Sequence, residues 1–162
     1  MNAITRKSRL HGTIAVPASK SHTIRGVLIA ALADGESVLQ KPLDSLDTRS
    51  AMKAVSAFGA TVRTDLETWV IRGVEGHPRI PDNVIDVGNS GTTLYMVMGT
   101  AALVDGWTIL TGDHQIRRRT AAPLIEALRR LDVEVFSTKG DGTSPIALRG
   151  PLRGGATSVD AI

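Results

Sequence analysis

The chain carries the stretch ALADGESVL at residues 31–39 and a near copy, ALVDGWTIL, at residues 102–110. The same separation of 71 positions places Ser19 on Ser90. Later parts of the two copies also match, at separations that grow as small loop insertions would make them: AFGATV (57–62) with RLDVEV (130–135), and VIRG (70–73) with IALRG (146–150). An internal duplication of this kind predicts two copies of one structural unit.

Both copies predict the same order of helices and strands. Apolar residues that recur at spacings of three, as at Met52, Val55 and Phe58, indicate helices, and glycines such as Gly59 end them. The first copy predicts a strand at 12–17, helix 21–34, strand 36–40, helix 46–59 and a hairpin of strands 60–64 and 68–72. The second predicts strand 83–88, helix 90–104, strand 107–112, helix 120–131 and strands 133–137 and 144–149. The order βαβαββ, found twice, predicts an α+β fold in which helices cover mixed sheets in two layers.

The duplication also predicts a domain organisation. Repeat unit one spans about residues 12–74 and repeat unit two about residues 83–150, with a connector at 75–82 that contains two prolines. Residues 151–162 read as the start of a third unit, and they stop without a helix cap or stop signal. We therefore expect residues 1–162 to form an incomplete domain.

Composition excludes several classes of protein. Apolar residues make up 42% and charged residues 22% of the 162 residues, which is typical of a globular protein. The absence of cysteine excludes a disulfide framework, a cysteine nucleophile and a thiolate metal site. No apolar run approaches the roughly 18 residues that span a membrane, and the N-terminus lacks the apolar core of a signal peptide. We expect a cytoplasmic protein with no membrane contact.

The charge balance points to an anionic partner. The formal net charge is +3 and the sequence pI is about 9.7, so small phosphates and nucleic acid are both possible partners. Aromatic residues make up only 3% of the chain and are scattered. Because single-strand binders usually offer stacking platforms, this disfavours nucleic acid without removing it.

The first candidate site is PASKSHTIR at residues 17–25, where a predicted strand runs into the start of a helix. Backbone amides at a helix start have no partner within the helix, and they carry a partial positive charge. Lys20 adds a full charge, and Arg25 lies one turn into the helix. The stretch is either a phosphate or carboxylate cradle, or an ordinary N-cap by Ser19 or Ser21 with solvated basic neighbours.

The second candidate site is DVGNSGTTL at residues 86–94, at the same place in the second copy. Gly88 and Gly91 allow a backbone to approach a ligand closely. Polar side chains surround them, at Asn89, Ser90, Thr92 and Thr93. The alternative interpretation is a glycine-rich turn with a cap, but the duplication would place the two loops side by side. The pattern is neither a Walker A loop nor a dinucleotide fingerprint.

The third candidate site is GDHQIRRRT at residues 112–120, whose three arginines precede a predicted helix. Arginines can clamp a phosphate or carboxylate with two parallel hydrogen bonds. A solvated basic loop or a nucleic-acid contact is the alternative, and it is the commoner origin of an isolated run of arginines.

Two smaller groups of residues have simpler interpretations. Asp47, at the start of its helix, is interpreted as a dipole or cap partner for Arg49. The four histidines show no metal-ligand spacing, so we expect no metal site: His11, His22, His77 and His114.

The three candidate sites belong to the stretches PASKSHTIRG (17–26), DVGNSGTTL (86–94) and GDHQIRRRTAAPLIEAL (112–128). In this order and at these separations, the three stretches resemble the enolpyruvyl transferase family. They match the shikimate-pathway branch of that family most closely. The resemblance covers about residues 10–162 and places the chain in the N-terminal portion of such an enzyme. It implies a fold of six βαβαββ units, three in each of two domains, with the active site between the domains.

The resemblance also implies an activity of the aromatic amino acid pathway. The enolpyruvyl group of phosphoenolpyruvate is transferred to the 5-hydroxyl of shikimate 3-phosphate, and phosphate is released without metal or organic cofactor. Lys20 would contact phosphoenolpyruvate and bridge toward shikimate 3-phosphate, and Arg119 would bind the phosphoenolpyruvate phosphate, so both count as catalytic. Ser21 and Arg25 would hold the shikimate moiety. The phosphoenolpyruvate pocket, where the inhibitor glyphosate competes, would be lined by Asn89, Gly91 and Thr92.

The sequence departs from the family pattern at three positions. Tyr95 stands where many members have arginine, Met96 where proline is frequent, and Thr120 where proline commonly follows the clamp arginine. The first two bear on glyphosate sensitivity and the third on where the next helix starts. The family's Ser-Ser-Gln motif and second domain are absent from this stretch, so we expect half a site and negligible turnover from this chain alone.

Three alternatives stay open from the sequence. One is a non-functional gene fragment, which would fold poorly because the sheets of its units expect neighbours. A UDP-N-acetylglucosamine enolpyruvyl transferase would usually have asparagine in place of Ser21 and often a cysteine in the clamp loop. A basic nucleic-acid-binding module is the alternative from another class, because βαβαββ units also occur in RNA-processing proteins.

Overall fold

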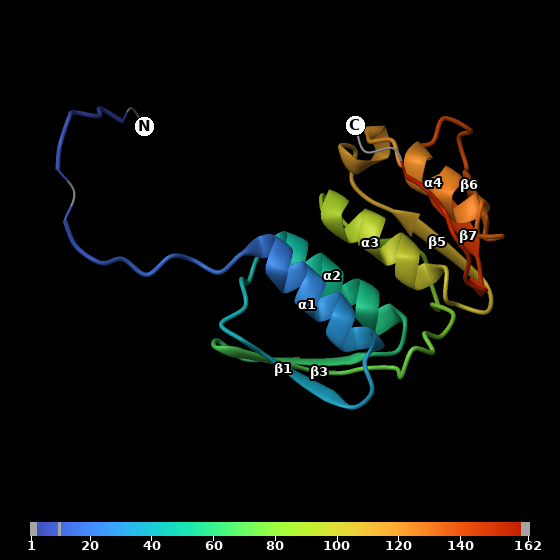
Figure 1. The fold of residues 1–162 in the computed structure, drawn as a ribbon, viewed down its shortest axis with the longest axis horizontal. Helices are drawn as coiled ribbons and strands as arrows, with labels where there is room; N and C mark the ends of the chain where they lie inside the picture. Colours follow the sequence, from blue (N-terminus) through green and yellow to red (C-terminus); the bar gives the residue numbers. More distant parts are fainter. Residues whose placement is uncertain (1–2, 10, 160–162) are drawn as a thin grey trace.

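The computed structural model describes residues 3–9 and 11–159, which form two α+β units side by side (Figure 1). The first contains α1 (Lys20–Leu32), β1 (Glu36–Gln40), α2 (Leu46–Ala57), β2 (Thr61–Thr64) and β3 (Thr68–Arg72). The second contains β4 (Ile85–Asp86), α3 (Gly91–Ala101), β5 (Trp107–Thr111), the short 3-10 helix η1 (Ile116–Arg118), α4 (Ala122–Arg129), β6 (Glu134–Ser137) and β7 (Ile146–Arg149). The expected fold class is confirmed.

The three strands of the first sheet have the same order as β5, β7 and β6 of the second, and β4 has no counterpart in the first sheet. The first has the strand order β1-β3-β2 and the second β4-β5-β7-β6, with β4 parallel to β5 and the other pairs antiparallel. In the first sheet Arg72 lies opposite Glu36 and Thr61. In the second, Arg149 lies opposite Trp107 and Glu134, the residues that the sequence duplication aligns with them. Equal strand registers support the predicted duplication.

α1, α2 and α3 lie between the two sheets, and the elements of both units share one core. α1 and α2 cover the sheet of the first unit, and α3 lies between them and β5 (Figure 1). The largest fully buried side chains come from both units, and they include Phe58, Ile71, Met98 and Leu110. Because α3 packs on α1 and α2 as well as on β5, the two units bury apolar surface against each other.

Serine residues begin the first three helices and fix where they start. Ser19, Ser45 and Ser90 each accept a hydrogen bond from a backbone N–H in the first turn, and Ser45 and Thr48 form a reciprocal capping box. After α1 and α2 the chain turns at Gly35 (φ 76°) and Gly59 (φ 106°), as the sequence predicted. The helices therefore begin and end at local signals.

The strand expected at 12–17 is wrong. These residues form no strand and lie exposed in the segment before α1, with Ile14 83% and Val16 78% accessible. In Figure 1 this segment runs away from the body of the molecule instead of along β1. The alternating apolar pattern is typical of a strand, but it buries nothing unless a sheet edge receives it.

The remaining boundaries differ by a few residues. The helix expected at 120–131 begins at Ala122, because the backbone of Thr120 instead forms an isolated bridge to Thr143 and its hydroxyl accepts the N–H of Ala122. Within residues 3–9 and 11–159, no helix has the length and apolarity to cross a membrane. Residues 151–162 were expected to start a third unit. Of these, residues 151–159 form neither helix nor strand, and residues 160–162 lie outside the described residues.

Candidate anion-binding site

Three helix starts converge on one hollow of about 910 Å³. The first residue of α1, the first two of α2 and the first two of α3 all line it. Each helix start carries a partial charge of about +0.5, and its first amides have no partner within the helix. The lining residues are Lys20, Leu46, Asp47, Arg49, Ser50, Lys53, Gly88, Asn89, Gly91, Thr92, Asp113 and Arg119.

Lys20 and Asp47 connect the starts of α1 and α2. The Lys20 ammonium donates to the Asp47 carboxylate at 2.7 Å. The starts of α2 and α3 are connected too, since the buried Thr93 hydroxyl lies 2.7 Å from the Ser90 hydroxyl and 3.5 Å from the Asp47 carbonyl oxygen. These contacts hold the three helix starts in one arrangement.

The hollow is positively charged overall. Four basic side chains line it, against the two carboxylates of Asp47 and Asp113. The helix starts add to this balance, so the hollow attracts an anion. Because the Lys20 ammonium is already paired with Asp47, a bound anion would either displace the Asp47 carboxylate from the ammonium or share the ammonium with it.

The expected pairing of Asp47 with Arg49 is wrong. Arg49 instead forms a two-pronged ion pair with Asp44, with both N···O distances 2.7 Å. The side-chain hydrogen bond from Arg49 lowers the pKa of Asp44, and the same bond raises the pKa of Arg49. Residues two apart on a helix point in different directions, so Asp47 faces Lys20 and Arg49 turns back to the residue before the N-cap.

The three consecutive arginines do different things. Arg119 lies over the start of α3, where a methyl group added to Gly91 would lie 2.8 Å from its guanidinium. Arg117 donates to the Gly112 carbonyl at 2.6 Å and does not line the hollow. Arg118 is exposed and does not line the hollow. Of the three arginines in the predicted clamp, only Arg119 therefore lines the hollow.

The loop before Arg119 is built around Asp113. Its carboxylate accepts the backbone N–H groups of Gln115 and Ile116 at 2.9 and 3.0 Å, which begins η1. The hydrogen bond from Ile116 makes the largest contribution to lowering the pKa of Asp113. After Arg119, the Tyr95 hydroxyl donates to the Thr120 carbonyl at 3.0 Å. Arg119 is thus held on both sides, by a turn and by a contact from α3.

Two of the three departures from the family pattern contact each other. Tyr95 and Thr120 stand where many members have arginine and proline, and here the tyrosine hydroxyl binds the threonine backbone. The third, Met96, is partly buried against the core. The departures at Tyr95 and Thr120 therefore belong to one local arrangement beside Arg119.

The hollow brings together five of the seven predicted site residues: Lys20, Asn89, Gly91, Thr92 and Arg119. Ser21 and Arg25 do not line the hollow. Seen along the axis of α1, Ser21 is rotated by about 100° from Lys20 and Arg25 by about 140°, so their side chains point in other directions. Sequence reasoning missed the contribution of α2. Its signal was present in LDTRSAMK (46–53), where polar and basic residues open a helix: Asp47, Arg49, Ser50 and Lys53.

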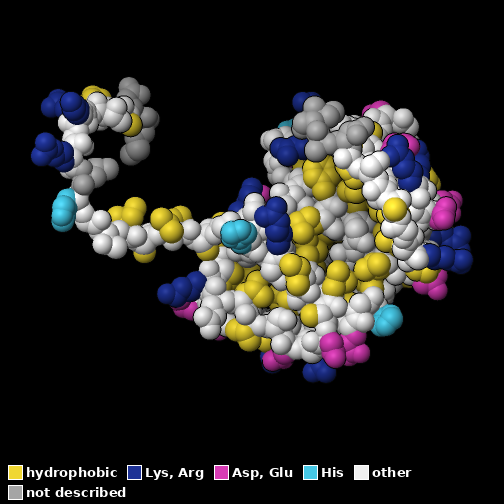
Figure 2. All heavy atoms as spheres, in the orientation of Figure 1, with side chains coloured by type: hydrophobic (Ala, Val, Ile, Leu, Met, Phe, Trp, Pro, Cys, Tyr) yellow, Lys and Arg dark blue, Asp and Glu magenta, His cyan; other side chains and the backbone are white. Residues whose placement is uncertain are grey.

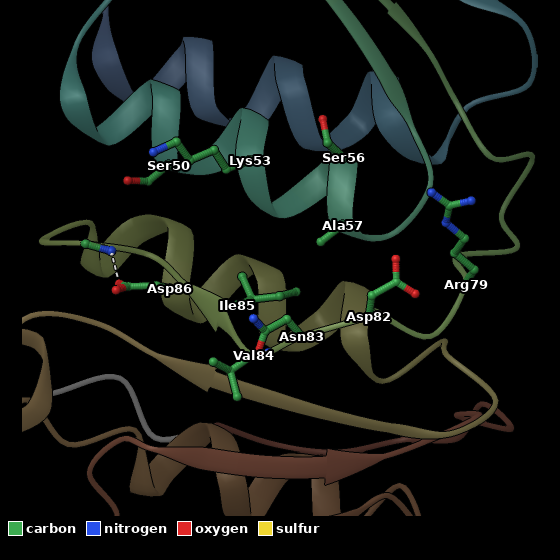
Figure 3. A pocket seen from close by; sticks show the side chains of 11 residues that line it. Ser50, Lys53, Ser56, Ala57, Arg79, Asp82, Asn83, Val84, Ile85 and Asp86 are labelled. Atoms are coloured by element: carbon green, nitrogen blue, oxygen red, sulfur yellow. Dashed lines mark hydrogen bonds between the residues drawn. The ribbon is translucent and has the colours of Figure 1, made fainter.

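A second pocket of about 490 Å³ continues the hollow along α2 (Figure 3). The two share Ser50, Lys53 and Gly88 as lining residues. Figure 3 shows Ser50 and Lys53 of α2 above Asp86, and its dashed line marks the bond from the Gly88 N–H to the Asp86 carboxylate at 2.8 Å. The polar surface therefore extends beyond the helix starts.

Comparison with known proteins places this chain in a family. The family model of EPSP synthase (3-phosphoshikimate 1-carboxyvinyltransferase) matches residues 4–161. A 3-phosphoshikimate 1-carboxyvinyltransferase of Ruminiclostridium cellulolyticum is 46% identical over 97% of this chain and 37% of its own length. One of Methanothrix thermoacetophila is 50% identical over 95% of this chain and 36% of its own length.

Solved structures agree on the fold. EPSP synthase from Acinetobacter baumannii superposes with a TM-score of 0.81 at 24% identity, over 93% of this chain and 33% of that one. The fold is thus that of an enolpyruvyl-transferase-type domain. The chain belongs to the EPSP synthase family. It spans little more than a third of the length of the curated relatives that it matches.

Proposed function

We propose that this chain supplies one half of a site that transfers the enolpyruvyl group of phosphoenolpyruvate to the 5-hydroxyl of shikimate 3-phosphate, with release of phosphate. The observation that carries the proposal is the convergence of three helix starts with Lys20 and Arg119 in one hollow. Both substrates are phosphorylated, and phosphoenolpyruvate carries a carboxylate as well, so a cationic hollow suits them. Family membership adds the reaction type.

Each residue has a role in the proposal. Arg119 binds the phosphate of phosphoenolpyruvate over the start of α3, and Lys20 lies between the two substrates. The glycine at position 91 lets the phosphate approach the first amides of α3, which Asn89 and Thr92 flank. Ser21 and Arg25 lie on another side of α1 and hold the shikimate moiety. The reaction passes through a tetrahedral intermediate, so positioning and charge stabilisation carry much of the catalysis.

The curated relatives are nearly three times as long as the part that this chain matches, and we expect the other half of the site in the remainder of such a protein. We therefore expect negligible turnover from this chain alone, while binding of the substrates to the preformed helix starts is measurable. Glyphosate, as a competitor of phosphoenolpyruvate, is expected to meet the same residues.

An amide NMR titration tests the proposal. Shikimate 3-phosphate is expected to shift the amides of residues 19–25, and phosphoenolpyruvate those of residues 88–93. Arg119→Met is expected to weaken phosphoenolpyruvate binding by about tenfold, the size of one charge-assisted contact. Arg118→Met removes the neighbouring exposed charge and is expected to change affinity less than twofold. Equal losses in both variants would show that only net charge matters and would refute the assignment of Arg119.

The same titration separates the alternatives. The relatives and the family model favour shikimate 3-phosphate over UDP-N-acetylglucosamine, so the sugar nucleotide is expected to give no saturable shifts at residues 19–25. A single-stranded oligonucleotide that bound more tightly than either substrate, with an affinity falling steeply as salt rises, would favour a nucleic-acid-binding module instead.

A further inference from the structure

The β6–β7 loop of the second unit is longer than its counterpart in the first. Eight residues, 138–145, join β6 to β7, whereas three residues, 65–67, join β2 to β3. The segment before the second helix of each unit differs in the same sense, with residues 112–121 before α4 and residues 41–45 before α2. Residues 112–121 form the clamp loop, which carries Arg119. The clamp loop and the β6–β7 loop are thus both longer than the duplication alone requires.

The β6–β7 loop pairs with the clamp loop directly after Arg119. Thr143 forms an antiparallel bridge with Thr120, the next residue along the clamp loop. The backbone N–H of Ala121 donates to the Gly142 carbonyl at 2.7 Å. Gly142 has a φ of +77°, and a methyl group there would lie 3.0 Å from the Thr120 hydroxyl oxygen. The backbone is therefore fixed by close contact at the two residues that follow Arg119.

A lysine of the β6–β7 loop holds the clamp loop on the other side of Arg119. The Lys139 ammonium donates to the Arg117 carbonyl at 3.0 Å. Arg117 lies in η1, and the last carbonyls of a helix have no partner within it and attract a cation. The β6–β7 loop therefore contacts the clamp loop both before and after Arg119.

Arg119 depends on this support because its side chain is exposed instead of being packed in the core. Figure 2 shows the same division for the molecule as a whole: apolar side chains gather in the middle of this face, and Lys and Arg side chains lie toward its edge. A long exposed side chain has many rotamers available. The position of the Arg119 guanidinium is therefore set mainly by the backbone that carries it.

One carboxylate gives the β6–β7 loop its shape. Asp141 Oδ1 accepts the N–H and the hydroxyl of Thr143 at 2.8 and 2.7 Å. The buried Ser137 hydroxyl lies 3.3 Å from the same oxygen and donates to the Thr143 carbonyl at 2.6 Å. The side-chain hydrogen bond from Thr143 makes the largest contribution to lowering the pKa of Asp141. Asp141 does not line the hollow, so it acts on the hollow only through the loop that it shapes.

We propose that Asp141 is a positioning residue for Arg119. Its carboxylate holds Thr143, and the pairing of Thr143 with Thr120 sets the backbone from which Arg119 reaches over the start of α3. The inference rests on the proposed function, in which Arg119 binds the phosphate of phosphoenolpyruvate. A carboxylate that does not touch the substrate thereby governs how tightly the hollow holds a phosphate.

Calorimetric titration with phosphoenolpyruvate tests the positioning role. Asp141→Ala is expected to weaken binding by about three- to fivefold, which is part of the effect of removing Arg119 itself. Asp141→Asn, whose amide oxygen can still accept both bonds from Thr143, is expected to bind within about 1.5-fold of the unmodified chain. Both variants are expected to keep the circular dichroism spectrum, because Asp141 is exposed. An affinity unchanged by Asp141→Ala would overturn the proposal.

Asp65→Ala is the matched control from the first unit. The Asp65 carboxylate shapes the β2–β3 turn by accepting the N–H groups of Glu67 and Thr68 at 2.9 and 2.7 Å, and it does not line the hollow. The control removes the same kind of hydrogen bonds from the equivalent hairpin, and it should leave the affinity unchanged. An equal loss in Asp65→Ala and Asp141→Ala would show that any loosened hairpin weakens binding, and would refute the specific role of Asp141.

A double-mutant cycle separates a failure of this inference from a failure of the proposed function. In an Arg119→Met background, Asp141→Ala is expected to cause no further loss of affinity, because the side chain that it positions is gone. Equal losses in both backgrounds would mean that Asp141 affects binding by another route, and the positioning role would be wrong. An Arg119→Met variant that binds phosphoenolpyruvate as tightly as the unmodified chain would refute the proposed function instead.

The amide resonance of Gly91 gives a readout that needs no substrate. The Arg119 guanidinium lies over Gly91, so Arg119→Met is expected to shift this resonance. Asp141→Ala is expected to shift it in the same direction by part of that amount, and to speed the hydrogen exchange of the Ala121 amide, which donates to the Gly142 carbonyl. If neither quantity changed in Asp141→Ala, the β6–β7 loop would not place Arg119, whether or not the chain alone binds phosphoenolpyruvate.

Discussion

At the scale of single residues, Gly91 decides how closely an anion approaches the start of α3. A methyl group at this position would lie 2.8 Å from the Arg119 guanidinium, which is the mobile end of a long side chain. Gly91→Ala is therefore expected to displace Arg119 with little effect on stability, and to weaken phosphoenolpyruvate binding by about three- to tenfold. Gly99→Ala in the same helix adds a methyl that meets nothing within 4 Å, and it should leave the titration unchanged.

Tyr95 belongs to the same local arrangement. Its hydroxyl holds the Thr120 carbonyl at 3.0 Å, one residue beyond Arg119. Tyr95→Phe removes one hydrogen bond at the surface, so the free energy of unfolding should fall by no more than about 1 kcal/mol. The freed loop should loosen Arg119 and weaken phosphoenolpyruvate binding two- to threefold in a calorimetric titration. An unchanged affinity would mean that the bond from the Arg119 N–H to Ile116 and the bridge to Thr143 hold the loop unaided.

At the scale of elements, the turn at Asp113 should make the clamp loop sensitive to acid. The N–H groups of Ile116 and Gln115 lower the pKa of Asp113 from its ordinary value of 3.8. A carboxyl with a lowered pKa in the folded state stabilises the fold above pH 3.8, and this contribution is lost as pH falls through the lower, folded value.

Asp113→Asn tests this because an amide oxygen can still accept both N–H groups but does not titrate in this range. We expect the urea midpoint of the variant to fall less steeply than that of the unmodified chain between about pH 4 and pH 2. Identical slopes would show that other carboxyls, such as Asp44 and Asp141, whose pKa values are also lowered, account for the acid response.

Local signals explain which elements the sequence predicted. The spacing of Met52, Val55 and Phe58 and the glycine after them define α2 without reference to the rest of the chain. The strand at 12–17 has an equally clear pattern, but a strand exists only where another edge pairs with it, and that is a non-local property. The candidate site divides in the same way. The loops that begin α1 and α3 were visible as motifs, whereas Asp47 enters the hollow only because α2 packs against both of these helices.

At the scale of the whole molecule, the two units should unfold together although each has its own sheet. α3 contacts α1 and α2 of the first unit and β5 and β7 of the second, and its Met98 is fully buried. The apolar side chains buried between the two units couple the two sheets, so removing part of this buried surface should destabilise both units. Met98→Ala is expected to lower the free energy of unfolding by about 2–4 kcal/mol through the lost contacts and the cavity left behind.

The chain offers a direct way to follow each unit, because its two tryptophans divide between them, Trp69 in β3 and Trp107 in β5. Trp107→Phe leaves a fluorescence probe in the first unit and Trp69→Phe leaves one in the second. In each background, urea unfolding followed by fluorescence should coincide with that followed by circular dichroism, and Met98→Ala should move both midpoints down together. If Met98→Ala shifted only the Trp107 signal, the core would be two separate cores, and the alignment of the three helix starts would have to rest on polar contacts such as Lys20 with Asp47 alone.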